Sequence, residues 1–267
     1  MKSRSRFILS VLFFGYAFLY IPLISVVFYS FNASSLATVW GGFSTRWYGE
    51  LLRNEQVLDA LFLSIKIGVT SATMATIFGT MSGLALARFG RFKGRTLFSG
   101  MISSPMVMPE VITGLSLLLL FITLQQLTGW PGQRGFSTIT IAHTTFSMAY
   151  VAVIVQSRLI SMDESLEEAA MDLGGKPLRV VFDITLPLIA PAMIAGWLLA
   201  FTLSLDDLVI ASFVSGPGST TLPMLIFSKV KLGVSPDINA LATIIIAAVS
   251  LGVAVAWLVT RQSVKTD

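Results

Sequence analysis

The sequence of 267 residues contains no cysteine and a single histidine, His143. Without cysteine the chain has no disulfide, no thiol nucleophile and no thiolate ligand for a metal. One histidine also excludes the histidine clusters that bind zinc. Thiol catalysis and chemistry at a cysteine- or histidine-bound metal are therefore excluded for this chain by itself.

Charged residues are scarce as well, at 12% of the chain against 54% hydrophobic residues. Soluble domains carry about 25% charged residues. Because a water-facing surface is hard to build from so few charges, the sequence predicts that something other than water covers part of the exterior. The length suits a single membrane domain over residues 1–267 and leaves no room for a sizeable second globular domain.

A nucleotide-binding phosphate loop is also missing. The run Gly174-Gly175-Lys176-Pro177 lacks the upstream glycine and the hydroxyl that such a loop uses to hold phosphate and magnesium. We therefore expect that this chain binds no cofactor, does not hydrolyse ATP and is not an enzyme. The alternative of a membrane-embedded enzyme finds no support, because no pair of nucleophile and base is visible.

Long apolar runs dominate the rest of the sequence. A membrane span needs about 20 predominantly apolar residues. The segments that qualify are residues 7–31, 60–87, 97–124, 138–155, 188–214 and 240–260. The first is too long for a signal-peptide core, so we predict an uncleaved span. The predicted fold class is an all-α membrane protein with six transmembrane helices.

The positive charges predict the orientation of the spans. If the N-terminus is cytoplasmic, the inside segments hold twice as many lysines and arginines as the outside segments. This bias favours a cytoplasmic position for both termini. We expect the basic loop 88–95 to meet anionic lipid headgroups rather than nucleic acid.

The loop 158–187 between the fourth and fifth spans contains signals for a short helix. Ser165 followed three residues later by Glu168 predicts a capping box, and acidic residues in the first turn suit the helix dipole. Gly174 suits the left-handed conformation that ends a helix. We therefore predict a helix over residues 166–173.

One face of this predicted helix is apolar. Leu166, Ala169, Ala170 and Leu173 follow the spacing i, i+3, i+4, i+7, which places them in one stripe. A helix of two turns is unstable by itself in water, so the stripe must be buried against something. The pattern fits burial on the chain's own spans, and it fits equally a groove in a cytoplasmic partner.

The same loop resembles a family signature. Glu168-Ala169-Ala170, Gly174, Ile184 and Leu186-Pro187 fill every position of the EAA signature of permease subunits of binding-protein-dependent ABC importers. Four further runs are similar to the polyamine branch of that family, to its putrescine permeases first and to its spermidine/putrescine permeases nearly as much. These runs are residues 29–32, 47–48, 105–109 and 203–213.

This resemblance implies a multi-pass permease with the type I importer fold in a bacterial inner (plasma) membrane. The partners that it implies are a homologous second permease, two cytoplasmic ATPase subunits that bind ATP and magnesium, and a periplasmic polyamine-binding protein. It also implies that helix 166–173 is a coupling helix seated in an ATPase groove. The residues assigned to ATPase coupling are Leu166, Glu168, Ala169, Ala170, Leu173, Gly174 and Pro187, of which Pro187 is expected to begin the fifth span with Pro191.

Three carboxylates lie inside predicted spans: Glu110, Asp206 and Asp207. A central aspartate costs about 2.5–3.5 kcal/mol on insertion scales, so each needs a reason. One reason is a pathway for a cation such as an organic diamine; another is a hydrogen bond or ion pair that joins spans. Because neighbours on a helix point about 100° apart, we expect one aspartate to line the path. Asp206 is favoured, since Asp207 lies on a face of small residues.

Four other features leave alternatives open. Pro105 and Pro109 predict either a broken helix at a transport site or an ordinary kink. His143 has no clear acidic partner in the sequence and is expected to be a packing or interfacial residue. The aromatic residues of segment 32–59 are typical of interfacial anchors, or they dock a partner outside the cell. Segment 215–239 is either re-entrant or a surface loop.

Two other transport functions compete with the one that the resemblance implies. A stand-alone secondary transporter coupled to a cation gradient would explain the carboxylates, but not the apolar helix in the loop. An ABC permease for another small solute, such as an amino acid or a sugar, is opposed only by the carboxylates and by the resemblance.

Overall fold

The computed structural model describes residues 2–36, 39–233 and 236–263, and its regular elements there are helices, with one isolated bridge between Asn32 and Phe43. In this described part, five helical segments are long and apolar enough to cross a membrane, and a shorter apolar stretch covers Pro236–Leu251. The predicted all-α membrane fold is therefore confirmed. The chain forms two compact units, residues 1–58 with 226–267 and residues 59–225.

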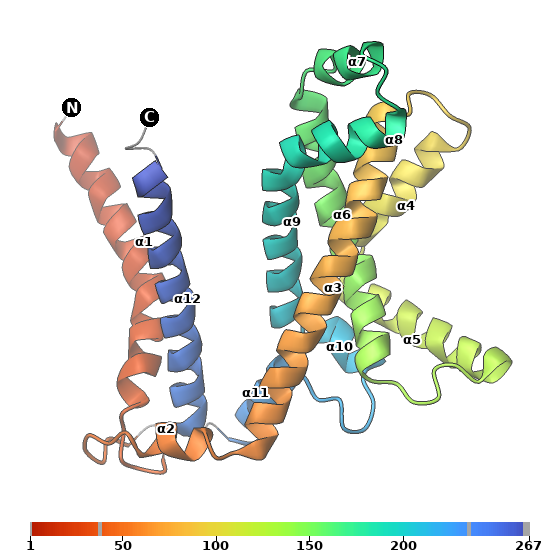
Figure 1. Cartoon of the computed structure of the whole chain (residues 1–267). Helices are drawn as coiled ribbons and strands as arrows, with labels where there is room; N and C mark the ends of the chain where they lie inside the picture. Colours follow the sequence, from red (N-terminus) through yellow and green to blue (C-terminus); the bar gives the residue numbers. More distant parts are fainter. Residues whose placement is uncertain (1, 37–38, 234–235, 264–267) are drawn as a thin grey trace. The chain divides into compact units, whose positions relative to one another are not determined.

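The first unit contains α1 (Lys2–Tyr29), α2 (Arg46–Leu51) and α12 (Pro236–Ser263). α1 and α12 lie side by side and run in opposite directions, so the start of α1 and the end of α12 lie at the same side of this unit (Figure 1). From Ile8 to Tyr29, α1 has a mean hydropathy of 2.3 and no buried residue within the chain. Such a uniformly apolar helix suits a lipid environment.

The loop between α1 and α2 is held together by its aromatic residues. The indole N–H of Trp47 donates to the carbonyl of Asn32 at 2.7 Å, and the hydroxyl of Tyr48 bonds that of Ser30 at 2.7 Å. Trp40 stacks on Phe28 with 4.5 Å between the ring centroids. Trp47 is buried, so the prediction that it anchors a span at the membrane interface is wrong.

The second unit holds most of α3 (Glu55–Arg88), and α11 (Leu222–Leu232) begins in it. Between them come α4 (Arg95–Val107), α5 (Glu110–Thr128), α6 (Phe136–Ser161), α7 (Ser165–Asp172), α8 (Pro177–Val180), the π-helical segment η1 (Val181–Thr185), α9 (Leu186–Asp206) and α10 (Val209–Val214). α6 is the most buried of the candidate spans, with α4, α9 and α10 packed on it. Val151 and Val155 of α6 form one core cluster with Ile189 of α9.

Glycine lets α3 approach α6 closely. A Cβ atom at Gly79 would lie 2.7 Å from Cβ of Val151, and one at Gly83 would lie 3.1 Å from the carbonyl oxygen of Ala152. No larger residue fits at Gly79 without a shift of the helices, as is usual where membrane helices pack through small residues. This contact fixes α3 against the centre of the second unit.

The predicted third span, residues 97–124, is two helices rather than one. The chain breaks at Met108 and Pro109, both extended with ψ of 138° and 135°. A residue before proline avoids the helical region, which explains why α4 ends there. The helix is therefore broken at Pro109, whereas Pro105 lies inside α4 without ending it; that the break marks a transport site stays a prediction.

The predicted fifth span, residues 188–214, is wrong at both ends. The helical run starts at Pro177 and passes through η1 into α9. Pro187 lies in the first turn of α9, as predicted, whereas Pro191 lies inside that helix. A π turn shifts the hydrogen-bond register by one residue, and here it directly precedes the proline-bearing turn. At the other end, Asp207 is extended with φ −67° and ψ 122°, which separates α9 from α10.

The predicted segment 215–239 contains the helix α11, whereas residues 234–235 lie outside the described residues. The backbone N–H of Leu222, the first residue of α11, donates to the hydroxyl of Ser64 in α3 at 2.7 Å. Leu222 and Leu225 are buried. The start of α11 is therefore packed rather than a free surface turn, and its re-entrant character stays a prediction.

Candidate functional site

The first candidate site is the end of the second unit that carries α7, called here the α7 end (Figure 1). α7 covers Ser165–Asp172, one residue from its predicted bounds. Its start differs from the prediction, because the side chains of Ser165 and Glu168 make no capping box. Instead the carboxylate of Asp163 accepts the N–H of Ser165 at 3.0 Å, in the manner of an Asx turn. This hydrogen bond lowers the pKa of Asp163 below its usual value.

The end of α7 is a Schellman motif, as the predicted role of Gly174 requires. Gly174 has φ +88°, and its N–H donates to the carbonyl of Met171 at 2.9 Å. The N–H of Gly175 donates to the carbonyl of Ala170 at 3.0 Å. A Cβ at Gly175 would lie 2.6 Å from that same oxygen, so both glycines are needed for this turn.

The apolar stripe of α7 is not covered by the chain's own spans. Leu166 is 49% exposed and Leu173 is 91% exposed, and no residue of α7 is buried. Ala169 and Glu168 are exposed, and Ala170 is half-buried. The alternative that this stripe packs on the chain's own bundle is therefore wrong for the described structure.

A cavity of about 1060 Å³ lies between α7, α8 and the helices of the bundle. Its wall is largely apolar and includes Phe78 and Met81 of α3, Phe98 of α4 and Met148 of α6. Glu164 and Glu167 line it on the α7 side. The cavity separates α7 from the bundle, so side-chain contacts must hold α7 in place.

Glu167 supplies those contacts. One carboxylate oxygen accepts from Nε of Arg88 at 2.8 Å, and the other accepts from the hydroxyl of Thr185 at 2.8 Å. Arg88 also donates to Glu164 at 3.0 Å. From the sequence, Glu167 was predicted only to suit the helix dipole, because partners 79 and 18 residues away leave no local pattern.

The predicted lipid contact of the loop 88–95 is limited to part of its charges. Arg88 is turned towards α7, and Arg95 donates to the carbonyl of Leu86 at 2.7 Å. Arg91 and Lys93 remain exposed. Arg88 is therefore engaged within the chain, and headgroup contact by Arg91 and Lys93 stays a prediction.

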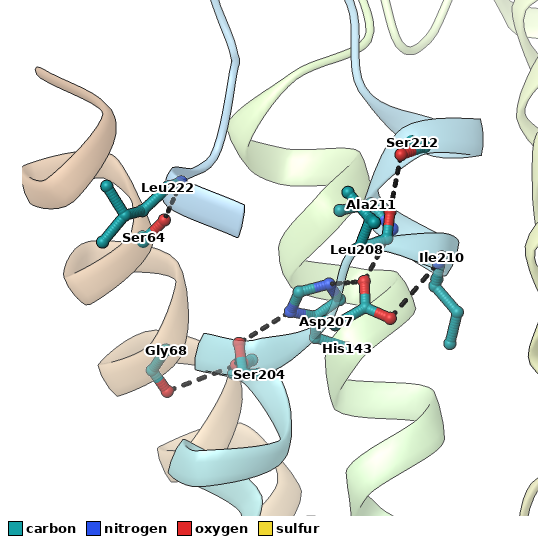
Figure 2. Close-up of polar contacts among 11 residues, drawn as sticks. Ser64, Gly68, His143, Ser204, Asp207, Leu208, Ile210, Ala211, Ser212 and Leu222 are labelled. Carbon is teal, nitrogen blue, oxygen red and sulfur yellow. Dashed lines mark hydrogen bonds and ion pairs between the residues drawn. The ribbon is translucent and has the colours of Figure 1, made fainter. Parts of the chain in front are cut away.

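The second candidate site lies at the break between α9 and α10 (Figure 2). His143 of α6 is 2% exposed; its Nδ1 bonds the hydroxyl of Ser204 at 2.6 Å and its Nε2 bonds the carboxylate of Asp207 at 3.0 Å. His143 is therefore a packed residue, as expected, and it has an acidic partner that was not apparent in the sequence. Because His143 and Asp207 are 64 residues apart, no local sequence pattern indicates that they pair.

Asp207 is occupied on both of its carboxylate oxygens. It accepts the N–H of Ile210 at 3.2 Å and that of Ala211 at 2.7 Å, so it caps the start of α10 as well as pairing with His143 (Figure 2). Ser71 of α3 extends the network by donating to Ser204 at 3.2 Å. Of the two explanations for a carboxylate in a span, joining helices therefore describes Asp207.

Glu110 and Asp206 have a different environment. Both are exposed in this chain, and neither pairs with a cationic side chain in the described residues. Glu110 is the first residue after the break at Pro109, and Asp206 is the last residue before the break at Asp207. The structure thus separates the predicted trio into one structural carboxylate and two that stand free at helix breaks.

Replacing Asp207 by alanine should lower stability far more than replacing Asp206 by alanine. The first change leaves His143 and two backbone N–H groups without an acceptor, at about 1–3 kcal/mol. The second removes an unpaired carboxylate and should stay within about 0.5 kcal/mol. Thermal unfolding of the two purified variants in one detergent measures the difference, and equal shifts would contradict this assignment.

The sequence matches a family profile described as "Binding-protein-dependent transport system inner membrane component" over residues 75–265. It is 58% identical over 262 residues to the putrescine transport system permease protein PotI of Escherichia coli (strain K12), covering 98% of this chain and 93% of that protein. It is 43% identical over 250 residues to the spermidine/putrescine permease PotC of the same strain, covering 94% and 92%.

Two solved structures share the fold. A chain of a bacterial ABC transporter that imports the acidic polysaccharide alginate superposes with a TM-score of 0.72 at 19% identity, over 98% of this chain and 97% of that one. A chain of the alginate transporter in complex with its pentasaccharide-bound periplasmic protein superposes with a TM-score of 0.70 at 15% identity, over 94% and 91%. At these identities the likeness concerns the arrangement of the helices.

Proposed function

Because the chain belongs to the family of binding-protein-dependent transport system inner membrane components, we propose that it is a permease subunit of an ATP-driven polyamine importer. Putrescine is the favoured substrate, supported by 58% identity to a putrescine permease against 43% to a spermidine/putrescine permease. The chain itself is a multi-pass inner membrane protein. In the proposed orientation both termini and the α7 end are cytoplasmic.

The proposed assembly has four kinds of component besides lipid and the polyamine. This chain forms the translocation path with a homologous second permease and couples to two cytoplasmic ATPase subunits, which bind ATP and magnesium. A periplasmic binding protein delivers the polyamine. The proposal of a binding protein is supported by the family description and by the fold neighbour that was solved with its periplasmic protein.

The uncovered stripe of α7 is the observation that carries this proposal. Leu166 and Leu173 are exposed on a two-turn helix whose own bundle lies across a cavity. Apolar surface in water is unfavourable by about 25 cal/mol per Å², and so short a helix needs its stripe buried to be stable. A groove in an ATPase that receives this stripe satisfies both requirements. Through the same contact, a conformational change driven by ATP hydrolysis is transmitted to the membrane helices.

Replacing Gly174 by valine should abolish polyamine-stimulated ATP hydrolysis in the assembled complex while leaving membrane insertion intact. Gly174 has φ +88°, which a β-branched residue does not tolerate, so the end of α7 would unwind and its stripe would be misplaced. ATP hydrolysis by the reconstituted complex, with and without the loaded binding protein, measures this.

The control for this variant is valine at Gly90, which has φ +60° in the loop before α4. It introduces the same backbone strain outside α7, so stimulation should persist. Normal stimulation in Gly174→Val would contradict the coupling role. Uptake of polyamine by this chain reconstituted alone, driven by a proton gradient, would favour the rival secondary transporter.

Glu110 and Asp206 are proposed to meet the cationic substrate. A diamine carries positive charge at each end and loses hydration when it enters the membrane, so it needs carboxylates that are not already paired. These two carboxylates are unpaired within the described chain and lie at breaks in the helices, where transport sites are commonly built. Asp207 is not part of this proposal, because its oxygens are occupied.

Replacing Glu110 by glutamine should lower kcat/KM for polyamine uptake by about tenfold or more, since a hydrogen bond to a charged group contributes about 1.5–3 kcal/mol. The amount of assembled complex should be unchanged. Glu55→Gln, at the exposed start of α3, serves as a matched loss of one carboxylate and should leave uptake as in the wild type. Unchanged uptake kinetics in Glu110→Gln would remove this residue from the pathway.

A further inference from the structure

α7 has no buried apolar residue with which to hold its place. A cavity separates it from α3, α4 and α6, and its packing neighbours are α8 and η1, which follow it closely in the chain. If a partner displaces α7, the displacement reaches the membrane helices only through physical contacts that stay intact during the motion. The polar contacts of α7 with α3 start from Glu164 and Glu167.

The two contacts with α3 differ in strength. Glu164 is 65% exposed, so water and salt screen its pair with Arg88. Glu167 is 13% exposed and Arg88 15% exposed, and their 2.8 Å contact is shielded from solvent. The second oxygen of Glu167 is held by the hydroxyl of Thr185, which is 1% exposed. One carboxylate therefore binds two separate elements in a fixed geometry.

Those two elements lead to the second candidate site. Arg88 is the last residue of α3, and Thr185 is the last residue of η1, which continues into α9. α3 and α9 meet again where Ser71 donates to Ser204 at 3.2 Å, and Ser204 in turn bonds His143. Glu167 thus contacts the ends of two helical runs, α3 and η1–α9, that meet again at Ser204, beside the break at Asp207.

We propose that Glu167 is the positioning residue that carries a displacement of α7 into α3 and α9, through Arg88 and Thr185. The inference rests on the proposed function, because it requires that a partner drives α7. Loss of the carboxylate charge weakens the shielded contact of α7 with Arg88 and Thr185 and leaves the exposed Glu164 pair and the packing on α8 and η1, so the partner's motion reaches the membrane helices only in part.

The test measures polyamine imported per ATP hydrolysed by the complete complex in lipid vesicles. Glu167→Gln keeps the size of the side chain and should lower this ratio about fivefold or more, the lower end of typical coupling between sites. Thr185→Val removes one hydroxyl and should lower it as well. A folding defect reduces import and hydrolysis together and leaves the ratio unchanged, so the ratio reports coupling alone.

A double variant tests whether Arg88 and Glu167 act through each other. If they do, Arg88→Gln with Glu167→Gln should lose no more coupling than the worse of the two single variants. Asp183→Asn is the matched control, because it breaks the pair of Asp183 with Arg179, which are 60% and 79% exposed, and should leave the ratio as in the wild type.

Two results would overturn the inference: a wild-type ratio in Glu167→Gln, or losses in the double variant equal to the product of the single losses. If Glu167→Gln does not assemble, Thr185→Val decides by the same ratio. A wild-type complex whose ATP hydrolysis ignores the loaded binding protein would instead overturn the proposed function, and the inference with it. The two failures are therefore distinguishable.

Discussion

An apolar stripe on a helix of two turns has to be covered, and this constraint underlies the rest of the structure. Leu166 and Leu173 are exposed, the bundle lies across a cavity, and the Schellman turn at Gly174 and Gly175 fixes where the helix ends. The backbone of α7 thus has a well-defined end, whereas its apolar stripe is left unburied by this chain. In the proposed assembly an ATPase subunit covers this stripe, and through that contact it drives a membrane subunit that does not hydrolyse ATP.

The carboxylates of the spans fall into two kinds, and only one of them belongs to the proposed cation pathway. Asp207 is bound by His143 and by the start of α10, so it holds the break between two helices in shape. Asp206 lies next to it and, like Glu110 at the other break, pairs with no cationic side chain among the residues that the structure describes. A helix break that is made rigid by a paired carboxylate and carries a second, exposed carboxylate suits a proposed pathway in which a cation binds and is then released.

Sequence reasoning succeeded where the signal was local. The all-helical membrane fold, the α7 helix to within one residue and its glycine end follow from hydropathy, periodicity and backbone preferences. It failed where the deciding partner is distant: Asp207 for His143, and Arg88 and Thr185 for Glu167. It also placed the ends of the fifth span wrongly, because hydropathy continues across the π segment and across the extended Asp207.

The absence of cysteine from the chain allows a direct measurement of what covers the stripe. A single cysteine replacing Ala169, which is exposed on α7, is labelled in native membrane with a short photoreactive cross-linker that attaches to the thiol and links to whatever lies beside it, with a cysteine replacing Leu52 in the loop before α3 as the comparison. We expect the Ala169 position alone to link to the ATPase subunit. Linkage of Ala169 to this chain's own helices, with no ATPase attached, would contradict it.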